Sequence, residues 1–256
     1  MTNQDRIRVF QENRILAYSD YKDYTARMLE GTVVFNKPSS IQTRRKAGEM
    51  KVEFLKADTV SAILHSARHR DRNICALNFA DALTPGGLVE QGEITQEESL
   101  CRCSNLYESL IKNECITDYY GFNRSLGGCI FSGRLIYSKD VAFFRESLNY
   151  SILNKVIKSD VVTCPAPIYN GDNGYYNVII GRIIGILLAM AKMGVKTAIL
   201  GAWGCGAFGG DAVTVGHAFR DALSKVNVFD KIYFAVVSTC NDTIDNYSLL
   251  QKGFYG

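Results

Sequence analysis

The chain has 256 residues, and its 29 Lys plus Arg against 26 Asp plus Glu give a formal net charge of +3. Hydrophobic residues make up 47% and charged residues 21%, which excludes wholesale disorder, a coiled coil and a collagen-like rod. A charge this close to neutral, without a long basic run, does not indicate a nucleic-acid-binding protein. We expect an accessory extension at residues 1–50 and one main domain at residues 51–256.

The first ten residues carry Asp5, Arg6 and Arg8 and include no apolar stretch long enough for a signal peptide. The longest apolar run, at residues 183–191, is too short to span a bilayer. We therefore expect a cytoplasmic protein with no membrane partner.

The chain contains eight cysteines, and several of them lie in apolar runs that resemble strands. Without a signal peptide, buried reduced thiols are the favoured interpretation. No Cys-x-x-Cys pair occurs, and the three histidines are not near any cysteine in the sequence, so we expect no structural zinc or other metal.

The pattern along the chain predicts polar helices within residues 1–30, then a solvated connection at 36–50. From residue 51, strand and helix patterns alternate. The predicted strands are 52–56, 73–79, near 129–131, 134–137, 156–164, 197–201 and 231–237, and the predicted helices are 59–69, 96–112, 176–193, 212–226 and one from Thr243. This alternation indicates an α/β fold whose mainly parallel sheet has helices on both faces and ligands at the carboxyl ends of its strands.

One glycine-rich loop follows the predicted strand 197–201. Gly204, Gly206 and Gly209 match the pattern G-x-G-x-x-G between a strand and a helix, where backbone amides can approach a diphosphate. The alternative is a tight turn whose glycines merely permit positive φ. A nicotinamide-dependent oxidoreductase also fits the pattern, but Asp230 precedes the next predicted strand and Asp242 lies beyond it, so the expected ribose-binding acid is missing.

A second loop, Pro85-Gly86-Gly87, is followed by Gln96-Glu97-Glu98 at the start of a predicted helix. Two adjacent carboxylates there can perform acid/base chemistry. They point about 100° apart on a helix, so they must have different roles. In the alternative interpretation, Thr95-x-x-Glu98 is a capping box and Glu98 only satisfies backbone donors.

These motifs resemble the microbial-type poly(ADP-ribose) glycohydrolases, and the similarity extends over roughly residues 50–240 in the family's order. The resemblance implies a macrodomain fold, no cofactor, and ADP-ribose or an ADP-ribosylated protein or nucleic acid as the substrate. It rests on Leu77-Asn78-Phe79-Ala80, Pro85-Gly86-Gly87, Gln96-Glu97-Glu98-Ser99-Leu100-Cys101-Arg102, Ile136-Tyr137-Ser138, Cys164-Pro165-Ala166-Pro167 and residues 200–209.

The same resemblance implies a role for each matching residue. Glu98 would be the general acid and base for the ribose–ribose bond, Glu97 would hold a ribose hydroxyl, and Gln96 would position the pair. Asn78 would contact the distal ribose, and Asp58 would accept the adenine amino group or simply cap the following helix. The glycine loops would hold the diphosphate and ribose through Gly86, Gly87, Gly204, Cys205, Gly206, Ala207, Phe208 and Gly209.

Leu88 is a departure, because the family has a third glycine at this position. A leucine side chain would narrow the distal ribose pocket or change the loop's dihedral angles, since leucine tolerates positive φ badly. The resemblance implies a hydrolase that releases ADP-ribose from the polymer. The second hypothesis is an ADP-ribose-binding module or a hydrolase of a mono-ADP-ribosyl linkage. The third hypothesis is the nicotinamide-dependent oxidoreductase.

Overall fold

The computed structural model describes residues 1–36, 49–128, 130–169, 171, 174–237 and 245–256. Its strands form one seven-stranded sheet in the order β1-β4-β5-β3-β6-β7-β2. The strands are β1 Val33–Phe35, β2 Lys51–Leu55, β3 Ile74–Phe79, β4 Leu135–Arg145, β5 Ile152–Cys164, β6 Thr197–Leu200 and β7 Lys231–Ala235. β5, β3, β6, β7 and β2 are parallel to one another, and β4 runs antiparallel to both β1 and β5. The predicted mixed, mainly parallel sheet is confirmed.

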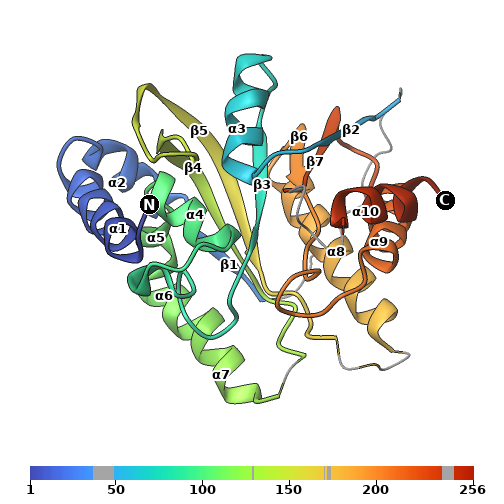
Figure 1. The fold of residues 1–256 in the computed structure, drawn as a ribbon. Coiled ribbons are helices and arrows are strands. Elements are labelled where there is room, and N and C mark those ends of the chain that lie inside the picture. Colours follow the sequence, from blue (N-terminus) through green and yellow to red (C-terminus); the bar gives the residue numbers. More distant parts are fainter. Residues whose placement is uncertain (37–48, 129, 170, 172–173, 238–244) are drawn as a thin grey trace.

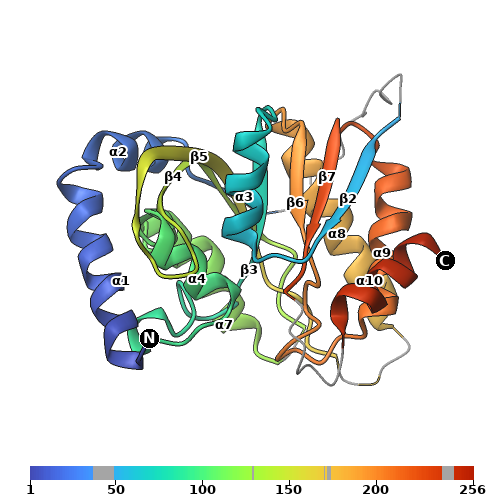
Figure 2. The same ribbon diagram turned by 45° about the horizontal axis from the view of Figure 1, so that its top comes forward.

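Helices cover both faces of the sheet, as Figures 1 and 2 show. α8, α9 and α10 lie on one side, and the helices of the amino-terminal half lie on the other. The helices are α1 Asn3–Tyr18, α2 Lys22–Glu30, α3 Thr59–Arg68, α4 Gln96–Cys103, α5 Leu106–Leu110, α6 Asn113–Cys115, α7 Phe122–Leu126, α8 Tyr175–Lys192, α9 Ala212–Lys225 and α10 Asn246–Tyr255, with a 3₁₀ turn η1 at Val89–Gln91 and a π turn η2 at Ile116–Gly121.

Strand β3 shows why the sheet needs helices on both sides. Cys75 and Leu77 belong to the apolar cluster with α8 and α9, whereas Ile74 and Ala76 belong to the cluster with α3 and α4. Successive side chains of a strand point to opposite faces. Because β3 is apolar from Ile74 to Leu77, it must be buried on both sides.

Helix α8 is long and apolar enough to cross a membrane by length and composition alone. In this fold it is a core helix, because Ile179, Ile183 and Ile186 are fully buried in the cluster that includes Phe219 of α9.

Three predicted elements differ from the structure. The predicted helix 96–112 is interrupted, because Ser104 adopts extended backbone angles and forms an isolated β-bridge with Phe143. Ile130 and Phe131 form no strand, and Cys129 lies outside the described residues. The antiparallel strand β4 continues to Arg145, well beyond the predicted end at Tyr137.

The extension before residue 50 forms the predicted helices, which are two, α1 and α2, and then strand β1, which no pattern predicted. Because β1 pairs with β4, the extension contributes an edge strand to the sheet. Most of the predicted connection at 36–50 lies outside the described residues, and the domain boundary at residue 50 stays a prediction.

Candidate active site

A cavity of about 560 Å³ opens at the carboxyl ends of the five parallel strands. Its wall takes residues from the loop after each strand, for example Asp58 after β2, Ala166 after β5 and Val236 after β7. A cavity of this volume is typical of small-molecule sites. The strand ends therefore meet where the sequence predicted a ligand site.

Most predicted site residues line this cavity. They are Asp58, Gly87, Leu88, Gln96, Glu97, Glu98, Gly204, Gly206, Ala207 and Phe208. Asn78, Gly86, Cys205 and Gly209 do not line it and lie behind or beside residues that do.

Glu98 lies in the first turn of α4, and the residue is only 4% exposed. Oε1 accepts a hydrogen bond of 2.9 Å from the Leu88 N–H, and Oε2 accepts one from the Thr95 hydroxyl. The side chain of Thr95 makes no capping bond to the helix backbone. The capping-box alternative was therefore wrong: the Glu98 carboxylate accepts from the backbone of the glycine loop and from the Thr95 hydroxyl, and the Thr95 side chain does not cap the helix backbone.

Glu97 is 2% exposed and is held by two donors. The Asn78 side-chain amide donates to Oε1 at 3.0 Å, and the Asp81 N–H donates to Oε2 at 2.7 Å. Burial raises the pKa of Glu97 to about 8, and the two hydrogen bonds only partly oppose this effect. At neutral pH Glu97 therefore keeps its proton and can donate to a hydroxyl oxygen of a ligand.

Asn78 is fully buried and does not line the cavity. Its side-chain amide donates to Glu97 instead. Gln96 is equally fixed: its Oε1 accepts from the Phe79 N–H at 2.8 Å, and its Nε2 donates to the Leu77 carbonyl at 2.8 Å. These contacts tie the start of α4 to the end of β3. Through these contacts Gln96 can position the glutamate pair, as the resemblance implied.

The loop after β3 requires glycine at position 87. Gly87 has φ +59, and a Cβ placed there would lie 2.5 Å from Glu98 Oε1. Gly86 also has positive φ, and a Cβ there would lie 2.8 Å from the ring of Tyr107. Positive φ is costly for residues that carry a Cβ. The two glycines let the backbone reach the carboxylates.

Leu88 does not strain this loop, in contrast to one sequence-based expectation. Its φ is −103, which any residue adopts, so the family's third glycine is not required here by backbone geometry. Its side chain lines the cavity and is 49% exposed. Any effect of Leu88 on substrates must therefore come from its side chain.

We expect Leu88→Ala and Leu88→Gly to increase kcat/KM on polymer by severalfold, because both remove the side chain beside Glu98. Alanine adds no backbone freedom, so it isolates the effect of side-chain volume. The rate of ADP-ribose release from polymer measures this effect. An unchanged or lower rate for Leu88→Ala would show that the side chain does not limit access.

Asp58 caps helix α3, as one of its two predicted roles required. Its Oδ1 accepts from the Ser61 N–H at 3.0 Å, and its Oδ2 accepts from the hydroxyls of Ser61 and Ser147. A carboxylate has about four acceptor positions, so one remains for a ligand. The predicted adenine contact stays a prediction.

The second glycine loop closes on itself through Gly209 N–H to Gly206 O and Gly210 N–H to Gly204 O, both 2.9 Å. Within the described part of the chain, no hydrogen bond uses the N–H groups of Gly206, Ala207 or Phe208. Consecutive free amides form a concave anion site. The loop is therefore suited to a phosphate.

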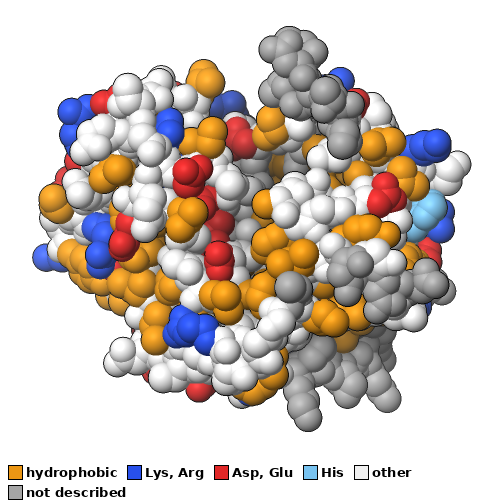
Figure 3. Space-filling model, turned by 60° about the horizontal axis from the view of Figure 1, so that its bottom comes forward, with side chains coloured by type: hydrophobic (Ala, Val, Ile, Leu, Met, Phe, Trp, Pro, Cys, Tyr) orange, Lys and Arg blue, Asp and Glu red, His pale blue; other side chains and the backbone are white. Residues whose placement is uncertain are grey.

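Charges around the cavity are mainly negative. Figure 3 shows acidic side chains close together near the middle of one face, with hydrophobic side chains beside them. The cavity wall includes four carboxyl groups, from Asp58, Asp81, Glu98 and the protonated Glu97, and none of the described residues that form it is Lys or Arg. An anionic ligand must be held there by backbone dipoles.

The sequence analysis missed Asp81. Its carboxylate accepts from the Leu83 and Thr84 N–H groups and shapes the loop, while its own N–H holds Glu97. An aspartate just ahead of Thr84-Pro85-Gly86 is a turn signal that could have been recognised. Val236, Val237 and Asn246, on the opposite wall, carry no motif.

Metal binding has no candidate residues in the part of the chain that the structure describes. No group of three or more His, Cys, Asp or Glu side chains there is arranged to hold an ion.

The model of the microbial-type PARG catalytic domain, where PARG is poly(ADP-ribose) glycohydrolase, matches residues 10–146. The chain belongs to this family. The match includes both carboxylates, the loop that holds them and most of α1. The resemblance seen in the sequence is confirmed.

Solved structures of this family share the fold. PARG from Thermomonospora curvata is 24% identical with a TM-score of 0.86, covering 98% of this chain and 100% of that chain. PARG from Deinococcus radiodurans in complex with ADP-ribose is 30% identical with a TM-score of 0.78, covering 90% and 94%. A search of curated proteins found no match.

Proposed function

We propose that this chain hydrolyses the O-glycosidic bond of poly(ADP-ribose) and releases ADP-ribose. One observation carries the proposal: the buried Glu98 carboxylate lies in the cavity wall, held by the backbone of a glycine loop. Membership of the PARG family supports it, as does the Deinococcus radiodurans enzyme, whose structure contains ADP-ribose.

The ligand's diphosphate would bind the free amides of Gly206, Ala207 and Phe208. The first turn of α9 is less suited to this role, because the Asp211 side chain already accepts from the Thr214 N–H. Asp58, which also lines the cavity, would accept the adenine amino group. This orientation directs the distal ribose toward Glu97 and Glu98.

Glu98 would act twice. As a carboxylic acid it gives its proton to the leaving 2′ oxygen, while the bond from that oxygen to the anomeric carbon breaks. As a carboxylate it then removes a proton from water, whose oxygen attacks the oxocarbenium-like carbon. One water is consumed, Glu98 regains its proton, and the products are ADP-ribose and a shortened chain.

Glu97 would hold a ribose hydroxyl during both steps. Its raised pKa leaves it protonated near neutral pH, so it can donate to that oxygen without adding a second negative charge beside Glu98. Asn78 and the Asp81 N–H would keep it in place.

The deciding experiment measures ADP-ribose release from automodified polymer and from mono-ADP-ribosylated Glu, Ser and nucleobase substrates. We expect release from the polymer. If only a mono-ADP-ribosyl substrate reacts, the chain is a hydrolase of that linkage. The half-exposed Leu88 side chain in the cavity wall favours this second candidate. No release from any substrate, with binding retained, would indicate a binding module.

ADP-ribose at millimolar concentration is expected to raise the Tm of the protein by several degrees, because it binds only the folded state. Thermal unfolding with and without ligand measures this shift. NADH is the comparison ligand. A larger increase in Tm with NADH than with ADP-ribose would favour the oxidoreductase alternative.

We also infer a cytoplasmic location and an ADP-ribosylated protein or nucleic acid as the acceptor. Free cysteines, of which Cys75, Cys101, Cys103, Cys115 and Cys164 are buried, support a reducing compartment.

A further inference from the structure

Helix α1 lies outside the cavity, yet it is bonded to the loop that holds Glu98. We propose that α1 is a positioning element of the active site, which fixes the loop at residues 86–93 and thereby the Leu88 N–H that binds the catalytic carboxylate. The proposal rests on the function proposed above and gives the amino-terminal extension a role in it.

The first turn of α1 meets the loop at its tip. The Asn3 side-chain amide donates to the Gln91 carbonyl at 3.0 Å, and Arg6 Nε donates to the Gly92 carbonyl at 2.5 Å. Arg6 Nη2 also donates to Asn3 Oδ1 at 2.6 Å. Two neighbouring carbonyls of the loop are thus bound by two linked side chains.

Gly92 makes this contact possible. It has φ +80, and a Cβ there would lie 2.7 Å from the Asn3 carbonyl oxygen and 2.9 Å from Asn3 Oδ1. The loop therefore approaches α1 more closely than any residue with a side chain would permit.

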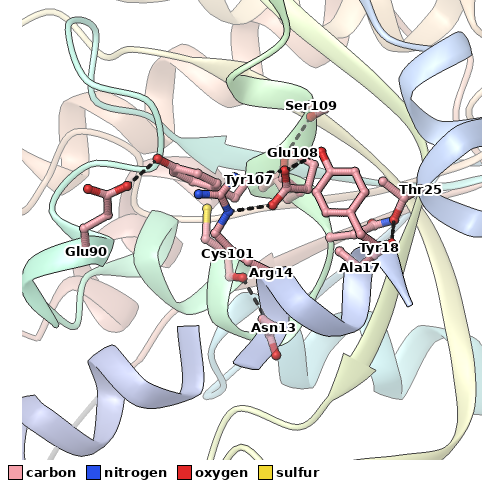
Figure 4. A network of polar contacts seen from close by, with 12 residues as sticks. Asn13, Arg14, Ala17, Tyr18, Thr25, Glu90, Cys101, Tyr107, Glu108 and Ser109 are labelled. Atoms are coloured by element: carbon pink, nitrogen blue, oxygen red, sulfur yellow. Dashed lines mark hydrogen bonds and ion pairs between the residues drawn. The ribbon is translucent and has the colours of Figure 1, made fainter. Parts of the chain in front are cut away.

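Tyr107 of α5 anchors the other part of the loop (Figure 4). Its hydroxyl donates to Glu90 Oε1 at 2.8 Å, and its ring lies against Gly86. On its other side the ring meets α1, since Phe10 packs edge-on at 4.8 Å and the Arg14 guanidinium lies 5.2 Å from the ring centre. The anchor of the loop is itself held by α1.

Helix α1 also holds the catalytic helix α4. The buried Asn13 amide donates to the carbonyls of Cys101, at 3.3 Å, and Arg102. Arg102, one turn beyond Glu98 on α4, donates to the Glu93 carbonyl where the loop ends. The loop and the helix that carries Glu98 are therefore joined directly by Arg102, and α1 is bonded to both of them.

Such fixation matters because loops are ordinarily mobile, and a displacement of about 1 Å in an active site can cost 10²-fold in rate. The Leu88 N–H lies three residues before Gln91, inside the segment that α1 holds. None of the residues of α1 lines the cavity, so its influence on the reaction must pass through the loop.

The test compares the double variant Asn3→Ala/Arg6→Ala with Arg8→Ala in the full chain. Arg8 is a matched control, since it lies on the same turn, is exposed and, among the described residues, pairs only with Asp5. Measured quantities are kcat and KM on polymer, Kd for ADP-ribose, Tm, and amide hydrogen exchange at residues 86–93. The single variants Arg6→Ala and Arg6→Lys test rescue, because lysine retains one donor for the Gly92 carbonyl.

We expect the double variant to lose about tenfold in kcat, with Kd for ADP-ribose changed by less than about threefold. Exchange at residues 86–93 should be faster, and Arg6→Lys should lose less kcat than Arg6→Ala. Arg8→Ala should match the wild-type protein in each measurement.

Unchanged exchange in the double variant would overturn the proposal, as would an unchanged kcat or a parallel loss of Tm and ADP-ribose binding. The exchange experiment does not depend on turnover. If the wild-type protein releases no ADP-ribose, the proposed function fails, whereas the exchange result still decides whether α1 holds the loop.

Discussion

Glu98→Gln is expected to lower ADP-ribose release from polymer by about 10³-fold, because an amide cannot exchange a proton with the leaving oxygen or with water. Binding of ADP-ribose and Tm should remain near wild-type values. Glutamine has the same shape, its amide oxygen can accept from the Leu88 N–H, and its amide nitrogen can donate to the Thr95 hydroxyl oxygen. Single-turnover release and ADP-ribose titration measure the two effects separately.

Glu93→Gln is the control for this variant. It makes the same chemical change on an exposed side chain of the same loop, so rate and stability should both be unaffected. The general acid/base role would be refuted if Glu98→Gln kept more than about a tenth of the wild-type rate.

Gly87→Ala should reduce activity by about 10²-fold, since the new methyl group would lie 2.5 Å from Glu98 Oε1 and displace the carboxylate. It should also cost about 1–3 kcal/mol of stability, because alanine would be forced to φ +59. Steady-state kinetics and denaturant unfolding measure these two consequences.

Gly128→Ala separates the two causes. Gly128 has φ +75 with nothing within 4 Å of a Cβ, so this variant suffers the backbone strain without any contact with a carboxylate. We expect it to lose stability and keep activity. Equal activity in both alanine variants would mean that close approach of Gly87 to Glu98 is not needed for the reaction.

Local patterns in the sequence predicted most of the fold. Alternating apolar strands and amphipathic helices were recognisable because side-chain periodicity is a property of each segment alone. The break in the predicted helix 96–112 was not, because it depends on the bridge between Ser104 and Phe143, which are distant in the chain. Strand β1 was not predictable either, because it has only three residues and forms by pairing with β4.

The candidate site was predictable in its residue types but not in its bonds. Thr95-x-x-Glu98 predicts a capping box, yet the Leu88 N–H competes successfully for the carboxylate once the loop folds over α4. Leu88 in a glycine position predicts strain, whereas the 3₁₀ turn that follows gives it negative φ. Both outcomes depend on how the loop is held against α1 and α5.

The sequence by itself determined the α/β class, the family, and which loops carry glycines and carboxylates, because these follow from residue order and spacing. Only the tertiary structure decided which donor each carboxylate of Glu97 and Glu98 accepts from, and that α1 holds the loop. A hydrogen bond forms only between groups within about 3 Å of each other, and distances that small between remote segments are set by the packing of the whole chain.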